Sequence, residues 1–331
     1  MYWDMTMEQL LANYPHTADF FAALPPVRDA AACSVQRYFD NLSEEQLQDQ
    51  GVSRQQLQER FGFFLELMEQ LQAEKEPVES ITILGGHNKR GRIENIRLTI
   101  CAGEIVTIVG ATGSGKSRLL ADIEWMAQQD TPTGRQILIN GRIPDTKYRF
   151  SPEHKLVAQL SQNMNFVVDL SVREFIGMHA ESRMVENVSA LTGDIIARAN
   201  QLAGESFAPD DPVTALSGGQ SRALMIADTA YLSSSPIVLI DEIENAGIDR
   251  QAALRLLVNK QKIVLMATHD PILALMGDKR LVIKNGGIEQ VLEPSPAERN
   301  CLRQLVDMDE KMSALRNSLR DGERIEALPW L

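Results

Sequence analysis

Apolar positions along the first 76 residues follow the spacing of helices. Segments of the form S/T-x-x-E/Q, which cap helix N-termini, stand ahead of these stretches at Thr6, Ser43 and Ser53. The longest apolar stripe follows the third segment and consists of Leu57, Phe61, Phe64, Met68 and Leu71. The pattern predicts a small all-α domain. We expect the stripe to pack inside that domain, and a docking surface for another protein is the alternative.

The pattern then changes to short β-branched runs, which indicate strands. These runs occupy residues 81–83, 93–100 and 105–109. The first two are expected to pair antiparallel, and the third has the continuous apolar character of a buried parallel strand. Helix-forming residues follow over 118–128. The sequence therefore predicts strand, loop and helix in that order around residue 110.

Helical patterns return in the second half of the chain, around residues 172–184 and 188–203. After Pro294-Ser-Pro296 a final helix carries a second apolar stripe, formed by Leu305, Met308, Met312, Leu315 and Leu319. Two heptads are too few to indicate a coiled coil. We expect this stripe to pack onto the chain's own preceding domain.

Composition narrows the class of protein. The 331 residues carry a net charge of −12, of which five basic and thirteen acidic residues give −8 in residues 1–76. This acidity argues against nucleic acid as a partner, which needs clustered Lys and Arg. No apolar run is long enough to cross a membrane, and the first residues lack a basic start followed by an apolar core, so we expect neither a membrane span nor a secretion signal. Three cysteines far apart in sequence fit reduced thiols of a cytoplasmic protein.

A phosphate-binding motif lies between the apolar strand and the helix near residue 110. Gly110-Ala-Thr-Gly-Ser-Gly-Lys116-Ser117 fits G-x-x-x-x-G-K-[S/T]. In this motif glycines let backbone N–H groups surround phosphate oxygens, the lysine reaches the outer phosphates, and the hydroxyl holds Mg²⁺. The chain is therefore predicted to bind a nucleoside triphosphate.

Two further motifs follow in a fixed order. Leu216-Ser-Gly-Gly-Gln220 precedes the apolar run Ile237–Ile240, which ends in Asp241-Glu242, and Ser217 lies 24 residues before Asp241. With these motifs the chain resembles the ATP-binding cassette (ABC) ATPase family over about residues 78–293.

The resemblance implies an α/β fold: a P-loop NTPase cassette with a mainly parallel core sheet, an antiparallel β subdomain and a helical insert, preceded by a small all-α domain. We expect the acidic helical domain over residues 1–76, the ATPase domain over 77–293 with its insert over 163–219, and a C-terminal helix and tail over 294–331.

The resemblance also assigns roles at an ATP and Mg²⁺ site. Nucleotide contacts fall to Gly110, Gly113, Ser114, Gly115, Lys116, Ser117 and Arg118. Ser117 and Gln162 are expected to hold Mg²⁺, with Asp241 orienting that shell, and Gln159 is the alternative to Gln162. The predicted catalytic residues are Glu242, which receives a proton from the attacking water, His269, which contacts the γ-phosphate, and Lys116.

In this family the Leu-Ser-Gly-Gly-Gln segment completes the site of a second cassette. The resemblance therefore implies a head-to-tail dimer with two-fold symmetry, in which the partner's γ-phosphate is capped by Ser217, Gly218, Gly219 and Gln220. Asp249 is the expected inter-subunit aspartate, although the loop before it is one residue longer than is usual. No aromatic residue lies between residues 77 and 110 to stack on adenine, so His87 is the candidate for that contact.

The work driven by hydrolysis has two interpretations. The acidic helical domain and the terminal helix favour a cytoplasmic ATPase that remodels or activates a protein partner, such as a metalloenzyme. The commonest function in the family favours the second interpretation, the nucleotide-binding subunit of a membrane transporter. Such a subunit would be held at the inner membrane face by its partner. In either case we expect a protein to dock on the helical insert or on the N-terminal domain.

Overall fold

The computed structural model describes residues 2–15, 17–25, 33–49, 51–72, 77–151, 154–161, 166–183, 185, 187–241 and 248–325. The chain divides into two compact units, Met1–Pro77 and Val78–Leu331. Each unit has its own hydrophobic core. No helix built from described residues combines the length and apolarity needed to cross a bilayer.

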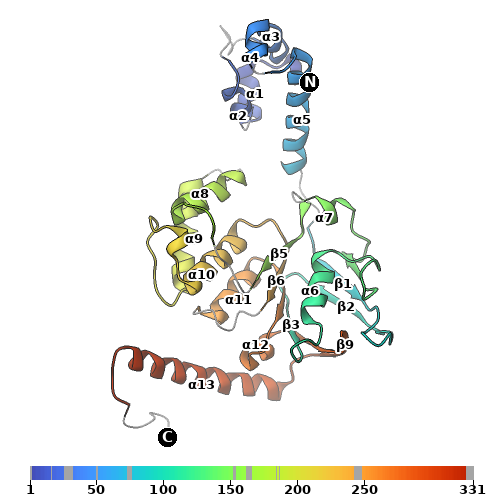
Figure 1. Cartoon of the computed structure of the whole chain (residues 1–331), viewed down its shortest axis with the longest axis vertical. Coiled ribbons are helices and arrows are strands. Elements are labelled where there is room, and N and C mark those ends of the chain that lie inside the picture. The colour runs from blue at the N-terminus through green and yellow to red at the C-terminus, as the bar shows by residue number, and fades with distance from the viewer. Residues whose placement is uncertain are drawn as a thin grey trace. The chain divides into compact units, whose positions relative to one another are not determined.

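The first unit is all helical (Figure 1). Its elements are η1 (Tyr2–Asp4), α1 (Met7–Asn13), α2 (Thr17–Ala22), α3 (Val35–Asp40), α4 (Glu44–Asp49) and α5 (Arg54–Gln72). All three predicted capping boxes are confirmed: each Ser or Thr hydroxyl accepts from the backbone N–H three residues on, and the Gln there accepts from the cap backbone.

The first three positions of the α5 stripe pack inside this unit, as predicted. Leu57 and Phe61 are buried and Phe64 packs against the same core. Trp3 meets Phe39 and Phe61 edge to face, with ring centroids 5.7 Å away in both pairs. Leu71 lies in α5, but its side chain is outside the described part of the chain.

The second unit contains two sheets, which confirms the α/β fold. The antiparallel sheet has the order β2-β1-β4 and consists of β1 (Ser80–Leu84), β2 (Arg97–Cys101) and β4 (Gln136–Ile139). The larger sheet has the order β5-β6-β7-β3-β8-β9 and is parallel except for the β8–β9 pair. Its strands are β3 (Ile105–Val109), β5 (Val157–Leu160), β6 (Ile237–Asp241), β7 (Ile263–Ala267), β8 (Lys279–Lys284) and β9 (Gly287–Leu292).

The described helices of the second unit are α6 (Lys116–Glu124), α7 (Lys147–Phe150), α8 (Val172–Ser182), α9 (Val188–Leu202), η4 (Val213–Ala215), α10 (Gly218–Tyr231), α11 (Arg250–Asn259), α12 (Pro271–Met276) and α13 (Pro296–Arg320). Helix α6 covers one face of the larger sheet, and α10 and α11 cover the other. Successive strand residues point to opposite faces, so Ile237 and Leu239 of β6 pack with α6, whereas Val238 and Ile240 pack with α10 and α11. Figure 1 shows α6 and α11 on opposite sides of these strands.

Two predicted boundaries were wrong. The strand expected over residues 93–100 begins only at Arg97, because Glu94 turns inward and its carboxylate is buried against Arg135. The helix expected over 118–128 runs from Lys116 to Glu124. It stops there because Met126 takes a left-handed backbone conformation, with φ of 47°, which a continuing helix does not allow.

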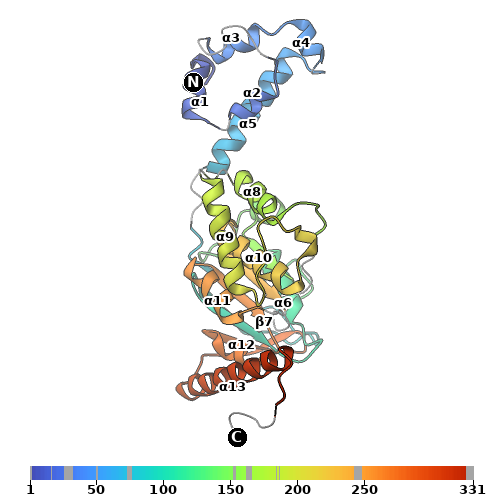
Figure 2. The ribbon, with the colours of Figure 1, turned by 90° about the vertical axis from the view of Figure 1, so that its left-hand side faces the viewer.

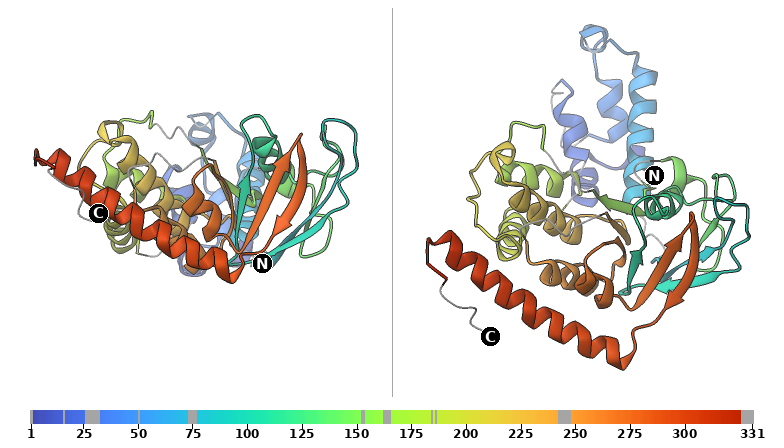
Figure 3. Two further views of the ribbon diagram at one scale, coloured as in Figure 1. Left: turned by 90° about the horizontal axis from the view of Figure 1, so that it is seen from below. Right: turned by 60° about the horizontal axis from the view of Figure 1, so that its bottom comes forward.

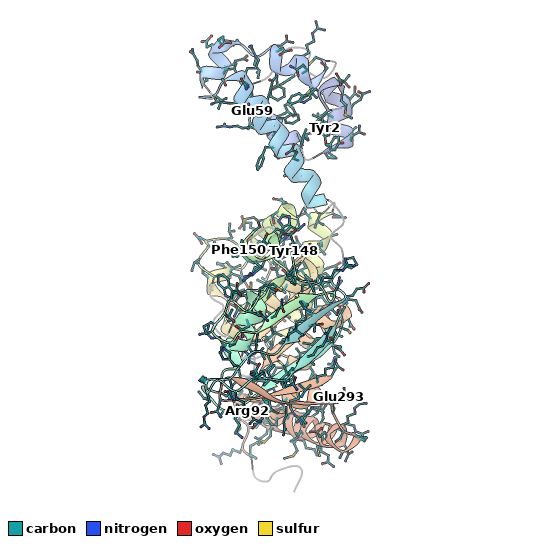
Figure 4. The ribbon with its side chains drawn as sticks, turned by 90° about the vertical axis from the view of Figure 1, so that its right-hand side faces the viewer. Tyr2, Glu59, Arg92, Tyr148, Phe150 and Glu293 are labelled. Atoms are coloured by element: carbon teal, nitrogen blue, oxygen red, sulfur yellow. The ribbon has the colours of Figure 1, made fainter. Side chains whose placement is uncertain are left out.

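Helices α8 and α9 form a layer against α10 with a core of their own. Figure 2 shows α9 running alongside α10. The layer is also joined to α10 by a polar contact, in which His179 Nδ1 lies 3.1 Å from Asp228 Oδ1. On the surface of the same unit, α7 carries the half-buried Tyr148 and the exposed Phe150 (Figure 4).

The C-terminal helix α13 runs beside α12 and continues beyond it (Figure 3). Leu305 and Leu315 are half-buried, but Met308, Met312 and Leu319 are exposed. The prediction that the whole stripe packs onto the preceding domain is therefore wrong for those three positions. Charged side chains of the helix reach the domain instead, through the ion pairs Arg280–Glu298 and Arg250–Asp309.

The His179–Asp228 contact predicts a pH dependence. The hydrogen bond that His179 donates to Asp228 raises the pKa of His179 above 6.5, against the smaller opposing effects of burial and of Arg183. A raised folded-state pKa gives a stabilisation that is full below about pH 6.5 and is lost as the pH rises through the pKa of His179. Because the imidazole is 36% exposed, we expect no more than about 1 kcal/mol.

NMR titration of the histidine Cε1–H signals, with His179→Gln to assign the resonance, measures this pKa directly. We expect a value above 6.5 that falls in Asp228→Asn. We also expect His179→Gln to lower the free energy of unfolding more at pH 5.5 than at pH 8.5. A His179 that titrates at or below 6.5 would contradict the assignment.

Candidate functional site

The loop between β3 and α6 is shaped by two glycines with left-handed backbone, Gly113 (φ 75°) and Gly115 (φ 111°). At Gly115 a Cβ atom would lie 2.8 Å from Gly286 Cα, so a side chain would push away the β8–β9 turn. The β8–β9 turn is hydrogen-bonded to the β3–α6 loop, since Gly286 N–H donates to Ser114 O (2.6 Å). The loop is therefore fixed without any ligand contact.

The N-terminus of α6 faces out of this loop without a side-chain cap. By contrast, α10, α11 and α12 begin with Ser217, Asp249 and Asp270, whose oxygens accept from backbone N–H groups of the first turn. The Ser114 hydroxyl is also buried with no hydrogen-bond partner among described residues. Unsatisfied donors at a helix N-terminus suit an anion, so these groups fit phosphate oxygens.

Lys116 and His269 meet at this loop although 153 residues separate them in sequence. Lys116 is buried, and its Nζ donates to Gly110 O (2.9 Å) and lies 3.0 Å from His269 Nε2. They meet because β3 and β7 are parallel neighbours with Ile108 opposite Ala267, which places both following segments at the same sheet edge. Because an ammonium group can only donate, His269 Nε2 accepts here.

Asp241 reaches the same edge from the adjoining strand. It ends β6 and stands opposite Ala267 of β7. Ser117 occupies the second position of α6. Gln159, the alternative to Gln162, lies within β5 rather than at its end. Gln162 and Glu242 themselves lie outside the described residues, so their roles stay predictions.

The Leu-Ser-Gly-Gly-Gln segment forms the start of α10. Ser217 caps the helix in a reciprocal pair with Gln220, whose amide also donates to Glu205 O and Ser206 O. Gly218 and Gly219 are its first two residues, so their backbone N–H groups stand at the helix start. Since α10 and α6 pack on opposite faces of the sheet, this segment and the phosphate loop begin helices of different layers.

Asp249 caps α11, with Oδ1 accepting from Ala252 N–H (2.9 Å), while its own N–H donates to Leu202 O (2.8 Å). The side chain is exposed on the surface of the second unit. A residue placed there is open to a second chain, which fits the predicted inter-subunit role without testing it.

Beside the phosphate loop lies a cavity of about 480 Å³. It brings His87 and Arg118 together with Gly115, and the lining also contains Asn88, Lys89, Gly91, Pro132, Thr133 and Gly286. His87 is exposed, and its N–H donates to Thr133 O (2.8 Å). The turn after it is closed by the hydrogen bond from Asn88 N–H to Arg92 O (2.9 Å); Figure 4 labels Arg92.

Comparison with known proteins decides the family. Residues 93–245 match the sequence profile of the ABC transporter family. An uncharacterised ABC transporter ATP-binding protein of Methanocaldococcus jannaschii is 51% identical over 251 residues, which is 75% of this chain and 95% of that protein. The chain belongs to the ABC ATPase family. It is an ATP hydrolase with an ABC cassette.

More distant relatives carry specific names. The macrolide export ATP-binding/permease protein MacB of Salmonella choleraesuis is 29% identical over 235 residues, 67% of this chain but only 34% of MacB. The spermidine/putrescine import ATP-binding protein PotA of Mannheimia succiniciproducens is 29% identical over 239 residues, 70% of this chain and 61% of PotA.

Solved structures agree on the fold. CbiO1 of Clostridium perfringens, part of the ABC transporter complex CbiONQ, superimposes with a TM-score of 0.54 at 22% identity, over 73% of this chain and all of that one. An ATP-binding subunit of an ABC transporter gives 0.51 at 17% identity, over 66% of this chain and 92% of the other.

The sequence analysis did not predict two sets of hydrogen bonds that support the phosphate loop. Lys89 Nζ donates to Gly113 O (2.9 Å) and so ties the phosphate loop to the first β turn. Arg135 is wholly buried, where its guanidinium binds Glu94 in a bidentate pair (2.7 and 3.0 Å), Asp122 (2.8 Å) and Gly286 O (2.8 Å). The signal available in the sequence was the charged Arg135 just before the apolar run Ile137–Ile139, because a charge next to a buried strand needs a partner.

Arg135 keeps its charge because of these partners. Burial lowers the pKa of Arg135, but hydrogen bonds and charge from Glu94 and Asp122 outweigh burial and raise it. Because the guanidinium holds Gly286, which in turn holds the phosphate loop at Ser114, the buried network supports the site from behind.

The loop geometry predicts the effect of Lys116→Ala. Removing the ammonium from beside Gly110 takes away the lysine that the motif assigns to the outer phosphates, so ATP affinity should fall at least about tenfold. Isothermal titration with ATP measures this, and circular dichroism checks folding. Lys311→Ala, on the exposed face of α13, is the matched control. Unchanged affinity in Lys116→Ala would refute the assignment of the loop.

Proposed function

We propose that two copies of the chain enclose two MgATP molecules head to tail and that hydrolysis drives a membrane-embedded transporter partner. The observation that carries the nucleotide part is the meeting of Lys116 and His269 at the uncapped N-terminus of α6. These groups lie in the segments that follow β3 and β7, and they converge where a γ-phosphate would lie.

Phosphate is bound by backbone donors and one ammonium. The N–H groups at the start of α6 and the Ser114 hydroxyl face the phosphate oxygens, and Lys116 neutralises the outer phosphates. Ser117 and Gln162 would hold Mg²⁺, with Asp241 at the end of β6 orienting the metal's water shell. Mg²⁺ supplies charge neutralisation on the β- and γ-phosphates.

His269 changes its role when the γ-phosphate enters. Its Nε2 now accepts from Lys116, so the ring proton of a neutral imidazole is on Nδ1. To donate to a phosphate oxygen, Nε2 must carry a proton, by tautomer exchange or by protonation. The phosphate thus replaces the lysine as the partner of Nε2, while Lys116 turns to the phosphate as well. Glu242 takes the proton of the attacking water.

A single copy leaves the γ-phosphate uncapped. Ser217 and Gly219 begin α10 on the other layer of the cassette, with exposed or half-exposed surfaces. In a two-fold dimer the α10 N-terminus of each copy faces the phosphate loop of the other, and Asp249 comes to the seam. Both sites are then built from both copies. His87 would lie against the adenine in the cavity beside Gly115.

The relatives favour the transporter interpretation of the partner. MacB is named for export, PotA for import, and CbiO1 is part of a transporter complex. Described helices of this chain do not span a membrane, so the spanning segments would come from the partner. The interpretation as a remodelling ATPase retains one supporting observation, the separate helical unit Met1–Pro77 with its own aromatic core.

Recovery of the partner tests this proposal. Glu242→Gln should hold ATP and keep the complex closed, so a tagged chain carrying it should bring down a polytopic membrane protein in fixed stoichiometry from detergent extracts. Lys116→Ala, whose affinity for ATP should be lower, is the control and should yield less of the closed complex. Purification that returns only a water-soluble enzyme complex, with none of the chain in the membrane fraction, would reject transport and favour remodelling.

A further inference from the structure

Arg250 joins three parts of the cassette that are far apart in sequence. It is the first residue of α11, directly after Asp249. Its Nη1 donates to Asp270 Oδ2 (2.5 Å), and its Nη2 donates to Asp309 Oδ2 (2.8 Å). One guanidinium therefore links the start of α11, the segment after β7 and the C-terminal helix.

The Asp270 end of this link holds the turn that carries His269. Asp270 Oδ1 accepts from the N–H groups of Ile272 (2.8 Å) and Leu273 (3.0 Å), and its own N–H donates to Thr268 Oγ1 (3.0 Å). Asp270 thus fixes both α12 and the turn around His269. Because Arg250 binds the second carboxylate oxygen, moving the guanidinium pulls directly on that turn.

The Asp309 end lies on a long, straight element. Helix α13 has 25 residues, and Arg250 grips it near its middle. The ion pairs line an open groove of about 800 Å³ whose walls include Ser313 and Arg316 of α13. The Arg250, Asp270 and Asp309 side chains are only 19%, 16% and 34% exposed, so each charge depends on its neighbours more than a surface charge does.

From this geometry we infer that Arg250 is a positioning residue through which Asp309 of α13 sets the turn that carries His269, and thereby the rate of hydrolysis. The inference rests on the proposed contact of His269 with the γ-phosphate. A planar guanidinium can bind two carboxylates at a fixed angle, so α13 holds Arg250 in the orientation that suits Asp270. Without Asp309 the guanidinium of Arg250 is held by Asp270 alone and can rotate, so the turn that carries His269 is no longer held in one position.

Substitution of Asp309 in the full-length chain tests this link. Alanine has a high helix propensity, so Asp309→Ala should leave α13 folded, and it leaves both members of the Arg250–Asp270 pair in place. We expect it to lower kcat at saturating ATP about three- to tenfold, in the range of coupling through a packed element. The KM for ATP should change by less than about twofold because the phosphate loop is untouched. Asp309→Glu, which restores a carboxylate, should recover most of kcat.

Two control variants separate positioning from a loosened helix. Asp307→Ala removes a carboxylate two residues away that pairs only with Lys311 on the same exposed helix, in the contacts described. Glu298→Gln removes the ion pair with Arg280, which holds the first turn of α13 to β8 and does not involve Arg250. Both should hydrolyse ATP at the rate of the unmodified chain.

The inference is overturned if Asp309→Ala keeps full kcat, or if Glu298→Gln loses as much as Asp309→Ala does. His269→Ala distinguishes this result from a failure of the proposed mechanism. If His269→Ala abolishes hydrolysis while Asp309→Ala does not lower it, the role of His269 stands and the link through Arg250 falls. If His269→Ala stays active, the proposed role of His269 falls too.

Discussion

The contact between Lys116 and His269 depends on one constraint, the parallel order of β3, β7 and β6. Parallel neighbours end at a common edge, so the phosphate loop, the turn after β7 and the end of β6 come together there whatever the sequence distance between them. The burial of these strands on both faces makes the register costly to shift, because a slip of one residue would exchange the cores against α6 and α10. The register of the sheet therefore fixes where these three segments meet.

Around this edge, support comes from buried polar contacts rather than from apolar packing alone. Arg135, with Glu94 and Asp122, holds the β8–β9 turn against the phosphate loop from one side. On the other side Arg250 holds the turn after β7 to the C-terminal helix. Both arginines bind two carboxylates. In both cases the planar guanidinium fixes the angle between the elements it joins, which the ammonium of a lysine would not do.

The sequence predicted the parts of this site that depend on local pattern. The phosphate loop, the apolar strand before it and the helix caps at Thr6, Ser43 and Ser53 each need only a few neighbouring residues, and the structure shows them where expected. It did not predict the Arg135 network or the hydrogen bond from Lys89 to Gly113, because the partners are 13 to 151 residues away. Such contacts depend on tertiary register, which residue spacing alone does not carry.

The wrong predictions have a related cause. The apolar stripe on α13 has the spacing of a buried face, but the helix extends past α12, and three of its five positions meet no core. Periodicity shows that a face is apolar and does not show what covers it. Glu242 and Gln162 lie outside the described residues and enter this account by their place in the motifs.

The central claim is that each ATP is shared between two copies. The most direct measurement is a cryo-EM or crystal structure of the Glu242→Gln chain with MgATP. The account predicts a two-fold dimer in which each γ-phosphate lies between Lys116 of one copy and Ser217 of the other. A map in which one copy encloses its nucleotide alone, with Ser217 far from every γ-phosphate, would contradict it.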